Sequence, residues 1–177
     1  MSEVTFKIEG TVLKKCEGSA DVIEIPKGVT AIYGWAFHGV SAERLIVPEG
    51  VTDIEQAFLC SKIKEIVLPS SLTVIGKSAF GGCELLEKLV IPESVTAIGS
   101  GAFGRCLSLT ELVIPEGVVS IEERCFESCG SLLHVTLPST LKSIGEKAFS
   151  HCDKLEELHI PTVWKASANV PLRTAKA

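Results

Sequence analysis

Cysteine and histidine are the residues of this chain best suited to chemistry, and four of them lie close together near the C-terminal end. Cys125, Cys129, His151 and Cys152 are all possible zinc ligands. A zinc site usually draws its thiolates from closely spaced CxxC-like pairs, and this spacing differs. Neighbouring side chains such as His151 and Cys152 also tend to point apart. The sequence therefore predicts no metal site.

The seven cysteines could instead form disulfides or a Cys–His nucleophile pair. An odd count fits poorly with full pairing, and parallel stacked side chains rarely reach the required S–S dihedral. A reactive thiolate needs polar, partly open surroundings. The favoured interpretation is a column of buried free thiols that fill an interior corner. Its members follow a phenylalanine by three residues or, for the first, by two: Cys60, Cys83, Cys106, Cys129 and Cys152.

Proline and phenylalanine recur with one period along most of the chain. The successive prolines are Pro26, Pro48, Pro69, Pro92, Pro115, Pro138 and Pro161, with gaps of 22, 21, 23, 23, 23 and 23 residues. Six of the seven phenylalanines keep the same spacing: Phe37, Phe58, Phe80, Phe103, Phe126 and Phe149. A fixed period of this length is typical of repeat proteins.

One unit, residues 86–106, shows the expected local structure. Its first part alternates, with Leu89 and Ile91 facing inward and Lys88 and Val90 facing outward, as in a half-buried strand. The following proline ends the strand because it cannot donate to a sheet. Later in the unit, Gly99 is expected to adopt a left-handed backbone.

A single unit cannot bury its apolar side alone, whereas stacked units can. The period therefore predicts a mainly β solenoid of about six stacked units of ~23 residues, with a parallel strand face. In such a stack the phenylalanines form a continuous spine.

Composition excludes several classes of protein. The net charge is −5, which is unlike a nucleic-acid binder. No apolar run is long enough to span a membrane. The first residues lack a secretory signal, so the cytoplasm is the expected compartment. No catalytic set or phosphate loop is found beyond what the repeat explains, so we expect no enzyme and no cofactor.

The repeat, L-x-x-L-x-I-P-x-x-V-T-x-I-G-x-x-A-F-x-x-C, resembles that of the BspA-like leucine-rich repeat family. It is matched closely at residues 63–83, 86–106, 109–129 and 132–152, and more loosely at 22–60. The resemblance implies a leucine-rich repeat solenoid. It also implies a surface adhesin that binds other proteins, which makes the cell surface the alternative compartment.

The repeat pattern weakens at both ends. We expect a single domain over 1–177, in which 1–21 form an N-terminal hairpin cap, 22–160 form the repeats and 161–177 form a degenerate C-terminal repeat or cap. Solenoids need such caps to cover their exposed ends.

The outward positions of the strands form two columns. One is apolar over four units and then polar, and the other alternates basic or titratable residues with acids. The candidate protein-binding face joins members of both: Ile46, Val67, Val90, Val113, Lys88, Glu111, His134 and Thr136. An exposed β-branched strip is typical of interaction sites, but strand propensity alone would also favour such residues. The charged column could serve only to hold the strands in register.

The predicted function is a non-enzymatic protein-binding module that uses this face, with a protein partner of unknown identity. We expect a monomer that binds no nucleic acid and has no membrane span. The alternative is a structural spacer segment of a longer repeat array, with no partner of its own.

Overall fold

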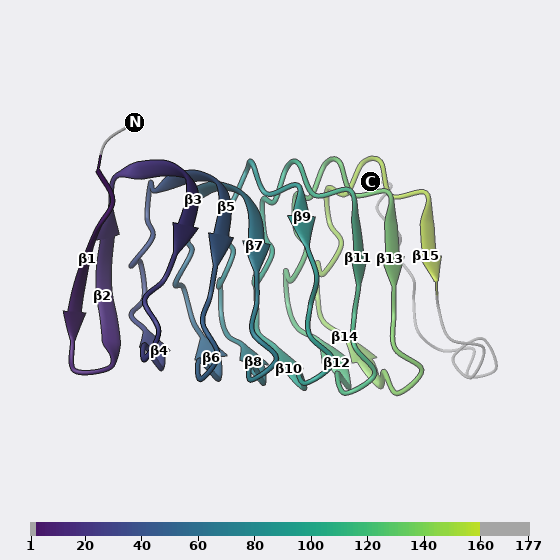
Figure 1. Ribbon diagram of the computed structural model, residues 1–177. Coiled ribbons are helices and arrows are strands. Elements are labelled where there is room, and N and C mark those ends of the chain that lie inside the picture. The colour runs from purple at the N-terminus through teal and green to yellow at the C-terminus, as the bar shows by residue number, and fades with distance from the viewer. Residues whose placement is uncertain (1–2, 160–177) are drawn as a thin grey trace.

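The computed structural model describes residues 3–159, which wind into a solenoid of about six turns (Figure 1). Each turn contributes one strand to a front face and a two-residue strand to a back face. The front strands are β3 (Ser19–Glu24), β5 (Ser41–Ile46), β7 (Lys62–Val67), β9 (Lys88–Leu89), β11 (Glu111–Val113), β13 (His134–Thr136) and β15 (Glu157–His159). The back strands are β4 (Ala31–Ile32), β6 (Asp53–Ile54), β8 (Val74–Ile75), β10 (Ala97–Ile98), β12 (Ser120–Ile121) and β14 (Ser143–Ile144). The predicted mainly β solenoid is confirmed.

The front strands are parallel and pair at the repeat spacing. Leu45 lies opposite Ile66, and Ile66 lies opposite Leu89, so that equivalent positions stack. The face consists of two sheets, β3-β5-β7-β9 and β11-β13-β15, because β9 and β11 lie side by side without pairing. The strand face is therefore interrupted near its middle.

A hairpin covers the N-terminal end of the stack. Strand β1 (Thr5–Glu9) pairs with β2 (Val12–Glu17) in antiparallel orientation, and β2 pairs in parallel with β4, the first back strand. Leu13 and Cys16 of β2 are buried. The predicted hairpin cap is confirmed, whereas the predicted C-terminal cap at 161–177 lies outside the described residues.

The phenylalanines form the predicted spine. Successive rings stack along the solenoid with centroids 5.1–5.4 Å apart, and from Phe58 onward each pair is within 12° of parallel. The first five rings of the column are completely buried, and Phe149 packs against the core at its edge. Each unit thus buries its apolar side against its own copy in the next turn.

The backbone around each phenylalanine alternates in handedness. The residues two before and two after it have positive φ in all six turns, and nine of these twelve residues are not glycine. In the first five turns, the N–H groups at the two positions and at the phenylalanine itself donate to the next turn, as from Gln56 to the Lys77 carbonyl. Most of the N–H groups between them donate three residues back within the same turn, as from Leu59 to the Gln56 carbonyl. These hydrogen bonds hold the left-handed residues in place.

The expectation that Gly99 is left-handed was wrong, since its φ is not positive. Close packing requires a glycine at this position instead, because a Cβ at Gly99 would lie 2.6 Å from the backbone nitrogen of Lys77. Gly145 is similar, with a Cβ that would lie 2.4 Å from the nitrogen of Glu123. These glycines let two turns approach each other.

Candidate functional site

The predicted apolar strip lies along the front face, at the ends of consecutive strands. Ile46 pairs in register with Val67, and Val113 pairs with Thr136. Val90 directly follows β9. Only part of the strip is exposed: Val90 and Val113 have 82% and 62% of their surface exposed, whereas Ile46 and Val67 are half-buried. The expectation of a fully exposed four-residue strip was therefore wrong for its first half.

Val90 and Val113 lie on either side of the break between the two front sheets. Val113 belongs to β11, and Val90 follows β9 at the equivalent repeat position. Two exposed β-branched side chains are thus placed where adjacent strands do not pair. Among the described residues they are the most exposed large apolar residues of the front face.

The charged column is in register, but its charges are only partly paired. Arg44 lies opposite Glu65, and the Arg44 Nε is 3.8 Å from the Glu65 Oε1. Lys88, Glu111 and His134 are exposed and form no ion pair with any side chain that the structure describes. The second half of the column therefore leaves its charges available beside Val90 and Val113.

The buried thiols donate hydrogen bonds along the stack. Cys83, Cys106, Cys129 and Cys152 each place Sγ 2.9–3.3 Å from the carbonyl oxygen of the phenylalanine one turn earlier. Burial raises the pKa of Cys83 to about 11 and raises the pKa of Cys106 well above its ordinary value. These two thiols stay protonated, a state unsuited to nucleophilic attack or to metal binding. The pKa of Cys152 is instead lowered, first by its side-chain hydrogen bond with Cys129.

The expectation that Cys60 belongs to this column was wrong. Its side chain is exposed, and Ser61 is buried in its place with Oγ 3.3 Å from the Cys83 Sγ. Cys60 occupies the left-handed position two after the phenylalanine, so its side chain points outward. His151 holds the equivalent position and is exposed, whereas Cys152 is buried, so these neighbours do point apart. Within residues 3–159 no three cysteine, histidine or acidic side chains are grouped as metal ligands.

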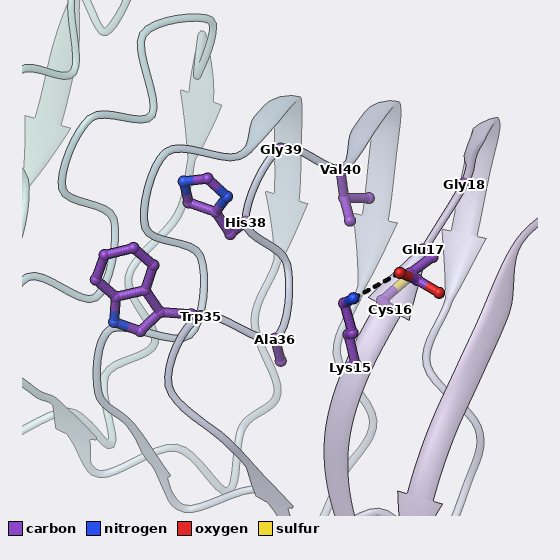
Figure 2. A pocket seen from close by; sticks show the side chains of 9 residues that line it. All are labelled: Lys15, Cys16, Glu17, Gly18, Trp35, Ala36, His38, Gly39 and Val40. Carbon is purple, nitrogen blue, oxygen red and sulfur yellow. Dashed lines mark ion pairs between the residues drawn. The ribbon is translucent and has the colours of Figure 1, made fainter.

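Sequence reasoning missed an aromatic cluster in the first turn. Tyr33 and Trp35 are 61% and 54% exposed, and the Trp35 ring stacks on His38 with centroids 5.3 Å apart. Figure 2 shows the Trp35 and His38 side chains across from the ion pair of Lys15 and Glu17. These four residues belong to the lining of a hollow of about 330 Å³. A larger hollow of about 670 Å³ lies on the Tyr33 side of Trp35. One signal was available, because Tyr33 is the chain's single tyrosine and both residues interrupt the repeat.

The stacked parallel strands and the phenylalanine spine define a leucine-rich repeat solenoid. The sequence matches the family described as BspA type leucine rich repeat region, in six copies, over residues 2–109 and 75–169. The chain belongs to this family. No curated protein is similar enough to count as a match. Residues 3–159 hold no helix able to cross a lipid bilayer.

Solved structures of bacterial proteins share the fold. A leucine-rich repeat protein from Bacteroides ovatus is 31% identical, with a TM-score of 0.79 over 91% of this chain and 46% of that one. The T. pallidum leucine-rich repeat protein is 25% identical, with a TM-score of 0.62 over 99% and 95%. The pneumococcal vaccine antigen PcpA is 24% identical, with a TM-score of 0.64 over 80% and 40%. This chain spans less than half the length of the first and third of these.

Proposed function

We propose that the chain is a non-enzymatic protein-binding module that holds its partner on the front face. The proposed contact residues are the eight of the predicted face: Ile46, Val67, Val90, Val113, Lys88, Glu111, His134 and Thr136. The exposure of Val90 and Val113, at the break between the two front sheets, carries the proposal. Exposed apolar side chains beside unpaired charges are typical of interaction surfaces.

The test compares a double variant of the face with a matched control. Val90→Ser with Val113→Ser removes the apolar centre, and both side chains are exposed, so stability should change little. Leu107→Ser with Val119→Ser removes two exposed apolar side chains, 40% and 43% exposed, at other positions of the repeat. In pull-downs from cell extract, the face variant should lose proteins that the wild type and the control retain. Equal recovery by all three would contradict the proposal.

A structural spacer is the second candidate, favoured by the fact that the chain spans only 46% and 40% of two of its relatives. A spacer needs only the stacked turns of the solenoid. If the chain is a spacer, Val90→Ser with Val113→Ser would recover the same proteins as the wild type and could differ from it only in stability. We further propose that the chain acts as a monomer, with light scattering as the check.

We propose the cytoplasm as its compartment because a reducing environment maintains the thiol donors of the cysteine column. The family's surface proteins make the cell surface the alternative. Fractionation of the source cells, followed by detection of the chain, distinguishes the two.

A further inference from the structure

A notch interrupts the solenoid between its first two turns, beside Tyr33 and Trp35. It is the hollow of about 670 Å³, and its lining includes both aromatic residues together with Asp53, Glu55 and Gln56. The spacing of the units explains its position. Phe37 is the fifth residue after Ile32, as in the other complete turns, but Phe58 is only the fourth residue after Ile54. The shorter turn leaves room beside Trp35 that a full-length turn would fill.

The Trp35 ring is held in place although it is exposed. Its Nε1 donates a hydrogen bond of 3.1 Å to the Gln56 Oε1 in the next turn. The His38 ring lies against the Trp35 ring with centroids 5.3 Å apart, and Figure 2 shows the two rings next to each other. The backbone is also fixed, because the Trp35 N–H donates to the Gln56 carbonyl at 2.8 Å. A ring held in this way loses little entropy when it takes up a ligand.

The notch has negative charge that no cation among residues 3–159 neutralises through an ion pair. Asp53 and Glu55 form no ion pair with any described side chain, although Lys77 is exposed on the following turn. Burial, and then the nearby charge of Glu55, raise the pKa of Asp53. The register of β4 and β6 sets Ile32 beside Ile54, which places Tyr33 next to Glu55. Carboxylates therefore lie beside the aromatic rings.

Of the two aromatic rings, Tyr33 and Trp35, the Tyr33 ring already has a cation beside it. The Lys14 Nζ lies 4.8 Å from the centroid of the Tyr33 ring and 4.0 Å from a carboxylate oxygen of Glu9. Trp35 has no such partner among the described residues, although it is the stronger cation–π acceptor of the two types. An open tryptophan beside two unpaired carboxylates complements a planar cation.

We propose that the notch binds an arginine side chain, presented by an extended segment of a partner protein. The guanidinium stacks against Trp35 and donates hydrogen bonds to Asp53 or Glu55. This site is separate from the front face and does not depend on the function proposed above for that face.

The probe is the capped tripeptide Gly-Arg-Gly, with Gly-citrulline-Gly as its neutral isostere. Titration is followed by the indole N–H resonance of Trp35 in the ¹⁵N-labelled chain, assigned against Trp164 by Trp35→Phe. We expect a saturable shift with the arginine peptide that weakens at high ionic strength, and none with the citrulline peptide. Val90→Ser with Val113→Ser should leave this titration unchanged.

Two variants test the site itself. Asp53→Asn with Glu55→Gln should weaken arginine binding about fivefold or more because it removes both charges while keeping their shapes. Trp35→Ala should weaken binding about tenfold, as read from the shifts of neighbouring backbone amides. An equal response to citrulline, no response to either peptide, or a response only to a methyl glucoside would overturn the proposal. Unchanged affinity in the double carboxylate variant would overturn it as well.

Discussion

The Sγ of Cys106 lies 3.3 Å from the carbonyl oxygen of Phe80, one turn earlier in the solenoid. The same carbonyl also accepts the N–H of Cys83, within its own turn. The thiol is thus a second donor that ties neighbouring turns together at a completely buried position. The same bond recurs for three further cysteines, so the column has a structural role along the stack.

Replacement of Cys106 tests this role. Cys106→Ala removes both the donor and the sulfur packing and should cost about 1–3 kcal/mol of unfolding free energy. Cys106→Ser keeps a donor and should cost less, since Ser61 fills the equivalent position in an earlier turn. Urea denaturation measures both, and a serine variant less stable than the alanine variant would argue against the bond.

Thiol labelling tests the outward position of Cys60. A water-soluble aromatic disulfide reagent should modify Cys60 rapidly in the native protein and reach the six buried thiols only on unfolding. The Cys60→Ser variant is the control, and it should lose the fast phase completely. Rapid native labelling of several thiols would contradict the burial of the column.

Glycine substitution tests the close approach of the turns. Gly99→Ala should destabilise the chain by about 1–3 kcal/mol because the added Cβ would lie 2.6 Å from the Lys77 nitrogen. Gly130→Ala is the matched control, since a Cβ there meets nothing within 4 Å and its φ is not positive. Thermal unfolding should separate the two variants, and similar melting temperatures would disprove the argument.

Charge reversal tests whether the charged column on the front face stabilises the stack. Glu111 lies opposite His134. In its own turn it holds the position that Lys88 holds one turn earlier. Glu111→Lys puts like charges beside each other and should lower stability by about 0.2–1 kcal/mol at low salt. The loss should shrink as salt is added. An unchanged melting temperature at low salt would show that the column does not stabilise the stack.

Acid titration tests the carboxylate of Glu116, which accepts hydrogen bonds from the next turn. The Ser139 hydroxyl and then the Ser139 N–H, at 2.7 and 2.9 Å, lower the pKa of Glu116 from its ordinary value of 4.5. A lowered folded-state pKa means that the contribution is present above pH 4.5 and is lost as the pH falls through the folded value.

Glu116→Gln should therefore lose less stability than the wild type between neutral and acidic pH. Glu93→Gln is the control, because Glu93 holds the equivalent position but forms no hydrogen bond with a described side chain. Melting curves at several pH values provide the measurement. A parallel decline of wild type and Glu116→Gln would refute the linkage.

Spacing alone determined the regular part of this protein. The phenylalanine column, the alternating strands and the buried thiols from Cys83 to Cys152 were predictable, because a repeated sequence places every copy in the same surroundings. One environment, deduced for residues 86–106, therefore described the turns from 63 to 152.

The tertiary structure decided the features that differ from one turn of the solenoid to the next. Cys60 is exposed and Ser61 is buried because the backbone two residues after Phe58 is left-handed, and Gly99 is small because another turn approaches it, not because its backbone is left-handed. The break between β9 and β11 and the notch beside Trp35 were likewise visible only in the tertiary structure. Such features depend on the distance between two turns, and the residue pattern of either turn alone does not contain that distance.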